Sequence, residues 1–86
     1  MNDEQAASRL AGQLDYLFED QPELRGAPPG RLLDRLNRED RLSRARAEEP
    51  LESDDWVQRR AEELENRFTP AQIERAIEIV RRRGAP

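Results

Sequence analysis

The sequence predicts an all-α fold, a small bundle of three to four helices with a helical corner at Phe68-Thr69-Pro70. Two observations lead to this prediction. Apolar residues recur at spacings of three and four along most of the chain, as on the buried face of an amphipathic helix. Capping residues stand before several of these segments, and no stretch alternates apolar and polar residues as a strand does. Because the chain has 86 residues, we expect a single domain over residues 1–86.

The first helix is predicted at residues 3–19. Asn2 is its expected N-cap, and Gln5, three residues on, can complete a capping box. A short further turn is expected at residues 22–26, because proline is tolerated in the first position of a helical turn. The apolar stripe of this helix consists of Ala7, Leu10, Leu14 and Leu17, widened by Ala6, Ala11 and Phe18.

The middle of the chain is harder to interpret. Residues 26–30, with two prolines flanked by glycines, predict a connector. A helix is predicted at 31–47, but its apolar pattern weakens after Asn37. The second half is therefore expected either as an exposed helix held by Arg–Glu pairs, which frays, or as a mobile strap. Residues 48–53, which contain Pro50, form the next connector.

A third helix is predicted at residues 54–67. Ser53 is its expected N-cap, and Asp54 and Asp55 lie in the first turn, where the helix dipole favours negative charge. The pattern favours one continuous helix, because apolar residues repeat at spacings of four, three and four. Its stripe consists of Val57, Ala61, Leu64 and Phe68.

The corner that follows has the strongest local signals in the sequence. Thr69 is predicted to cap a helix at 70–83, with Gln72 as its capping-box partner. Pro70 falls at the first helical position, where its missing N–H costs nothing. Phe68 and Ile73 are spaced to close a hydrophobic staple across the cap. We expect the helices at 54–67 and 70–83 to meet here at a fixed angle.

Composition excludes several kinds of chemistry. The chain lacks cysteine and histidine, and all its basic residues are arginine, so thiolate, imidazole and lysine catalysis are absent. The acidic clusters at 52–55 and 62–65 lack the spacing of a calcium loop. We therefore expect no enzyme activity, no catalytic residues, no cofactor and no metal. Without an apolar leader or membrane span, a cytoplasmic protein is expected.

A thin apolar core favours an interaction protein. Charged residues make up 40% of the chain and apolar residues 35%, and small domains with so little core often gain stability from a partner. We expect a helical adaptor or regulatory subunit that binds another protein or itself. Aromatic and aliphatic side chains are the usual anchors of such surfaces. The predicted partner-binding residues are Trp56, Ile79, Leu10, Leu14 and Phe18, with Tyr16 a weaker candidate.

A small DNA-binding regulator is the alternative. The last predicted helix is rich in arginine, and a recognition helix contacts bases and phosphates with such side chains. The net charge of −4 and the glutamates of the preceding helix count against this alternative. Neutralising the helix dipole is also a simpler role for the arginines at the end of the helix. The residues expected to contact nucleic acid are Gln72, Arg75, Arg81, Arg82 and Arg83.

Overall fold

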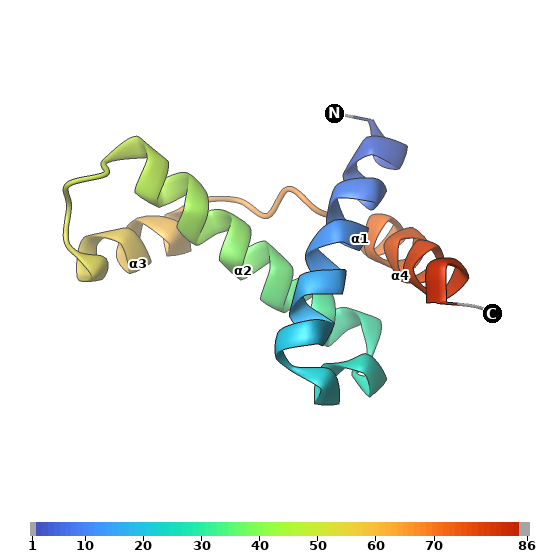
Figure 1. The fold of residues 1–86 in the computed structure, drawn as a ribbon. Coiled ribbons are helices and arrows are strands. Elements are labelled where there is room, and N and C mark those ends of the chain that lie inside the picture. The colour runs from blue at the N-terminus through green and yellow to red at the C-terminus, as the bar shows by residue number, and fades with distance from the viewer. Residues whose placement is uncertain (1, 85–86) are drawn as a thin grey trace.

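The computed structural model describes residues 2–84 and shows a small all-α bundle (Figure 1). Within these residues there are four α-helices, one short 3₁₀-helix and no strand. Their bounds are α1 (Asp3–Asp20), η1 (Pro22–Gly26), α2 (Pro29–Glu48), α3 (Asp54–Glu63) and α4 (Pro70–Gly84).

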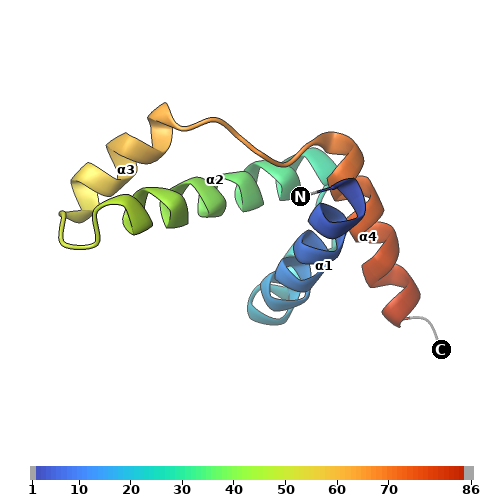
Figure 2. The same cartoon turned by 90° about the horizontal axis from the view of Figure 1, so that it is seen from above.

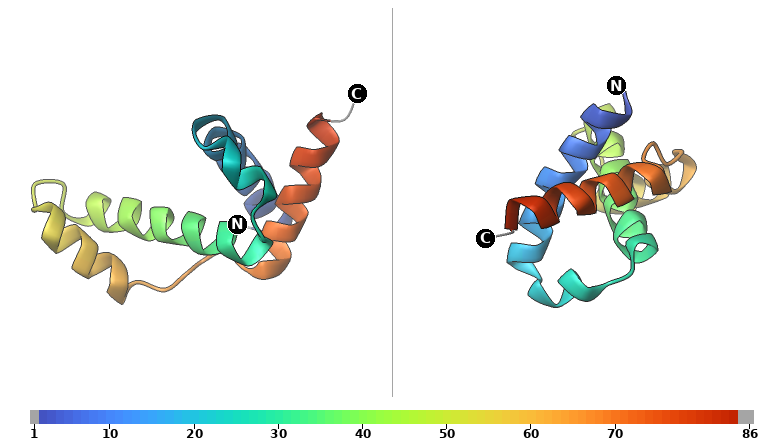
Figure 3. Two further views of the ribbon diagram at one scale, coloured as in Figure 1. Left: turned by 90° about the horizontal axis from the view of Figure 1, so that it is seen from below. Right: turned by 90° about the vertical axis from the view of Figure 1, so that its right-hand side faces the viewer.

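The molecule has two parts. The body consists of α1, η1, α4 and the first half of α2 (residues 29–37), and α4 lies across α1 in it (Figure 3). The arm consists of the second half of α2 (residues 38–48) and α3, and it projects away from both termini (Figure 2). The radius of gyration is 13.9 Å, and the extents are 46 × 28 × 19 Å. A compact domain of this length has a radius of about 12 Å, so the arm elongates the molecule.

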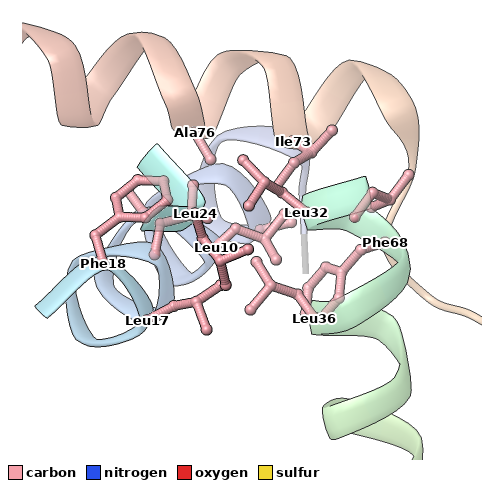
Figure 4. Packing of buried hydrophobic residues seen from close by; sticks show 13 residues of the cluster. Leu10, Leu17, Phe18, Leu24, Leu32, Leu36, Phe68, Ile73 and Ala76 are labelled. Carbon is pink, nitrogen blue, oxygen red and sulfur yellow. The ribbon is translucent and has the colours of Figure 1, made fainter. Parts of the chain in front are cut away.

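The main core lies in the body. Leu10 and Leu14 of α1, Leu36 of α2 and Ile73 of α4 are all at most 1% exposed. Figure 4 shows Leu10, Leu36 and Ile73 pointing toward one another from three helices. Leu24 of η1 also belongs to this cluster. Burial of these side chains supplies most of the apolar stabilisation of the fold.

The arm has a much smaller core. Only Ala45, Val57 and Ala61 are fully buried there, and two of these three are alanines. Leu42 and Trp56 pack against them while remaining partly exposed. α2 thus serves two clusters with two different faces. This explains why Leu42 lies off the stripe that the first half of the helix sets.

The predicted caps are confirmed. Asn2 and Gln5 exchange two hydrogen bonds, with the Gln5 amide donating to Asn2 Oδ1 at 2.8 Å. Ser53 accepts from the amide of Trp56 at 3.3 Å and starts α3. Caps of this kind each stabilise a helix by roughly 1 kcal/mol. They explain why these starts could be located from the sequence.

The predicted helix at 54–67 is wrong in its last four residues. α3 ends at Glu63, and residues 64–69 run extended back along α2 to α4 (Figure 2). The corner at Phe68-Pro70 therefore joins α4 to an extended segment instead of joining two helices. Thr69 and Gln72 still form the predicted capping box, with bonds of 3.0 and 3.3 Å, and both members of the predicted staple are buried in the main core.

The middle of the chain is more helical than expected. α2 begins at Pro29, inside the predicted connector 26–30, because proline is well suited to the first position of a helix. It continues to Glu48 as one helix, not as a strap. Burial of Ala45 against α3 gives the second half a tertiary contact, which the one-dimensional apolar pattern did not reveal.

Candidate interaction surfaces

Three of the predicted partner-binding residues are part of the body core. Leu10 and Leu14 have no exposed surface, and Phe18 is 6% exposed. Their apolar stripe is covered by α4, η1 and α2 of the same chain. The prediction that they face a partner is therefore corrected, since they already pack within the molecule.

The other predicted anchors lie at the edges of the two clusters. Trp56 is half-buried against the arm core, and Ile79 is half-buried against the body core. Tyr16 is 79% exposed on the far side of α1. Leu51 is an additional candidate, because it is fully exposed in the connector at the tip of the arm. Side chains that are partly packed and partly open are preorganised for contact with another molecule.

The extended segment 64–69 is tied to α2 by buried polar groups. Asn37 donates from Nδ2 to the carbonyl of Phe68 at 3.2 Å, and its Oδ1 accepts from the Phe68 amide at 3.1 Å. One turn on, the buried Asp40 accepts from Nε and Nη2 of Arg67 at 3.0 and 2.6 Å. Nε of Arg44 lies 3.0 Å from the other carboxylate oxygen, a charge contact without hydrogen-bond alignment.

Two further arginines of α2 hold the same segment. Arg41 donates to the side chain of Asn66, and Arg44 donates to the carbonyl of Glu65. The bond from Arg44 gives the Glu65 carbonyl a partner that a longer α3 would have supplied from its own backbone. These contacts explain why the chain leaves the helical conformation after residue 63. They also fix the arm relative to the body.

The base of α4 is not available as a nucleic-acid contact. Gln72 is 8% exposed, its side-chain oxygen caps the helix at Thr69, and its Nε2 donates to Asp3 at 2.8 Å. The prediction that Gln72 reads a base is therefore corrected. Because the side chain is nearly buried and is held by these two bonds inside the protein, it is not presented to a base edge.

The arginines of α4 mostly pair with acids. Contact with Glu4 raises the pKa of Arg75, with a smaller contribution from Glu78. Arg81 makes no ion pair with the described residues and lies at the rim of a pocket. The ion pairs of α4 are Arg75 with Glu4 and Glu78, Arg82 with Glu78, and Arg83 with Asp15, at 2.7 to 3.3 Å.

The inner angle between α1 and the arm holds a hollow of about 650 Å³. Much of its charge is already compensated, because Arg35 pairs with Glu39 at 2.8 Å and Arg67 pairs with Asp40. Arg9 and Tyr16 lie at its rim. The hollow therefore lacks the strong single-sign field that would attract one class of charged ligand.

One face of the arm forms a shallow groove along the seam between α2 and α3. Leu42 and Gln58 line both of the hollows that make up this groove. The α2 lip is basic and the α3 lip is acidic. The basic residues are Arg38, Arg41 and Arg46, and the acidic residues are Asp54 and Glu62. Arg46 and Asp54 form an ion pair across the seam at 2.5 Å, whereas Arg38, Arg41 and Glu62 form no ion pair with the described residues.

The opposite edge of the arm is held by an ion pair. Arg60 donates to both carboxylate oxygens of Glu48, at 2.7 and 3.0 Å, and also contacts Glu63. These hydrogen bonds lower the pKa of Glu48 and raise the pKa of Arg60. The pair connects the end of α2 to the middle of α3. It supports a hairpin whose apolar core is small.

Comparison with protein-family models, curated proteins and solved structures finds no significant match to this chain. No helix among residues 2–84 is long and apolar enough to cross a membrane. The same residues hold no group of three or more acidic side chains arranged to bind a metal ion. The class that the fold defines is a small all-α protein with a helical body and a projecting helical arm.

Proposed function

We propose that the protein is a non-enzymatic interaction module, an adaptor or regulatory subunit, whose arm docks onto another protein. The observation behind this proposal is the arm itself. Its two helices project from the body and share a core of three residues, two of them alanine. A pair of helices with so little shared apolar surface gains stability when a third element covers the seam.

The seam suits a helix of the partner. Leu42 lies between the lips, next to Val57, and offers an apolar contact to an incoming side chain. The basic lip on α2 and the acidic lip on α3 would orient a helix that carries opposite charges along its two edges. Neither Trp56 nor Leu51 lines the seam. Trp56 is half-buried against the arm core and Leu51 is fully exposed at the tip, so each offers the partner a separate apolar contact.

The test exchanges the charges of the two lips without touching the core. Arg38 and Glu62 are exposed and make no ion pair with other described residues. The double variant Arg38→Glu/Glu62→Arg keeps the net charge and removes most of the charge difference between the two lips. Tyr16→Ala, on the body surface, is the matched control. Wild type and variants are tagged, used for capture from the native source, and then measured by calorimetry against the purified captured protein.

Wild type and Tyr16→Ala are expected to bind the same protein, and the lip-exchanged variant to bind it more than about tenfold more weakly. Equal binding by that variant would contradict docking on the seam, and so would the absence of any complex. Light scattering distinguishes self-association from binding to a different protein. A symmetric dimer remains complementary when both copies carry the exchange. A dimer that is weakened by Arg38→Glu alone and restored by the double exchange would therefore assign the seam to a second copy.

A further inference from the structure

A separate pocket of about 290 Å³ lies at the far end of the body, between η1, the start of α2 and the end of α4. Its volume is at the lower end of the range for small-molecule sites, so it matches a small ligand better than a large cofactor. Apolar side chains from α1, α2, α4 and the connection before α2 form its walls. They are Phe18, Ala27, Pro29, Leu32, Ile77 and Val80.

Two arginines line the same pocket. Arg25 lies over the ring of Phe18, 5.4 Å from its centroid, and Arg81 approaches from the last turn of α4. Neither makes an ion pair with a carboxylate of the described residues, whereas most arginines of α4 do. No acidic residue of the described chain lines the pocket. The positive charge at its rim is therefore uncompensated.

The start of α2 adds to this positive potential. Pro29, the first residue of the helix, is part of the pocket wall, and Pro28 supplies no side-chain cap. The first turn of α2 contains no acid, unlike the first turns of α1 and α3. The positive end of the helix dipole thus faces the pocket without a protein anion. The negative end of the α4 dipole is also at the pocket, where Gly84 is part of the wall. Arg81, which makes no ion pair with the described residues, offsets part of that negative potential, whereas Arg82 and Arg83 are paired with acids.

We propose that this pocket binds a small carboxylate with an apolar body, such as a medium-chain fatty acid. The hydrocarbon part would lie against the walls formed by Leu32, Ile77 and Val80. The carboxylate would accept hydrogen bonds from Arg25 and Arg81, which can each form two parallel bonds to it. This site is on the body, so it is independent of docking by the arm.

Octanoate is the probe for the full chain. Binding is followed by calorimetry and by amide chemical shifts. The control ligands are acetate, which lacks the long hydrocarbon chain, and octan-1-ol, which lacks the carboxylate. Octanoate is expected to bind saturably, to shift the amides of Ala27, Val80 and Gly84, and to bind more tightly than either control ligand. The variant Arg25→Gln/Arg81→Gln should weaken octanoate binding about tenfold or more. The matched control is Arg38→Gln/Arg59→Gln on the arm, which should leave octanoate affinity unchanged.

Four results would overturn the proposal. They are the absence of saturable shifts with octanoate, equal affinity for octan-1-ol, unchanged affinity in the Arg25/Arg81 variant, and shifts confined to the arm. If these amides respond to an acidic helical peptide and not to octanoate, the pocket belongs to a protein partner and the proposal fails. Melting curves of both double variants show whether each is folded before its affinity is interpreted.

Discussion

The carboxamide of Asn37 makes two hydrogen bonds to the backbone of Phe68, 31 residues further along the chain. The donor and the acceptor of the side chain are both used, and the whole arrangement is buried. It replaces the backbone partners that Phe68 would have had in a helix. This one side chain helps to decide that the segment before α4 is extended, and hence where the arm lies relative to the body.

Asn37→Ala is expected to lower the free energy of unfolding by about 1–3 kcal/mol, because the amide and carbonyl of Phe68 would be left buried without partners. Chemical denaturation followed by circular dichroism measures the change. Asn66→Ala is the control, since Asn66 is exposed and its bond to Arg41 is made by its side chain. An equal loss of unfolding free energy in both variants would show that the buried hydrogen bonds between Asn37 and Phe68 contribute no more than the exposed bond of Asn66.

Asp40→Asn should also destabilise the protein, by about 1–2 kcal/mol. Its carboxylate is 4% exposed and accepts from Arg67, and Arg44 is close to it. Both arginines are about a third exposed, so solvent screens part of the interaction and the loss is smaller than for a fully buried pair. Glu39→Gln changes a neighbouring carboxylate that is half exposed and should cost less. Urea midpoints of the two variants provide the comparison.

Leu14 and Tyr16 are two residues apart on α1, but Leu14 faces the body core and Tyr16 faces solvent. Leu14→Ala should cost about 2–5 kcal/mol, because it leaves a cavity in the body core. Tyr16→Ala should change stability by less than about 0.5 kcal/mol, since Tyr16 is 79% exposed. Thermal melts of both variants measure this difference. A small effect of Leu14→Ala would contradict the assignment of Leu14 to the body core.

The Glu48–Arg60 pair predicts a pH dependence of the arm. Hydrogen bonds from Arg60 lower the pKa of Glu48 from its ordinary value of 4.5. A carboxyl whose pKa is lower in the folded state stabilises that state fully above its unfolded pKa, and this stabilisation is lost as the pH falls through the folded pKa. Acidification below about pH 4.5 should therefore loosen the arm.

Fluorescence of Trp56, the single tryptophan of the chain, reports on the arm during an acid titration. Glu48→Gln removes the titrating group, so the part of the fluorescence change that depends on Glu48 should disappear in that variant. An identical titration curve in wild type and variant would show that the pair does not contribute.

Local chemistry made the starts of α1, α3 and α4 predictable. Each cap acts on a group only three residues away, so the sequence alone shows the capping arrangement. The capping residues are Asn2 with Gln5, Ser53, and Thr69 with Gln72. The apolar stripe of α1 was also visible, because its spacing is set by the geometry of the helix. The class of fold followed from these features.

The path between the helices was not predictable from local patterns. Val57, Ala61, Leu64 and Phe68 are spaced as on one helix, yet Phe68 belongs to the body core and Leu64 to the arm. The hydrogen bonds between Asn37 and Phe68 join residues 31 positions apart, and they favour the extended conformation over the helix that the spacing predicts. Similarly, the sequence could not show that the stripe of Leu10 and Leu14 is covered by α4, because that requires knowing which helices meet.

Hydrogen exchange on the free, full-length chain tests most directly whether the arm is a weakly supported element attached to a stable body. The buried amides of α1 and α4 should exchange only with global unfolding, while the amides near Val57 and Ala61 in α3 should exchange at least about tenfold faster. Equal protection in α3 and α1 would mean that the arm is as stable as the body without a partner. That result would contradict the basis of the proposed docking function.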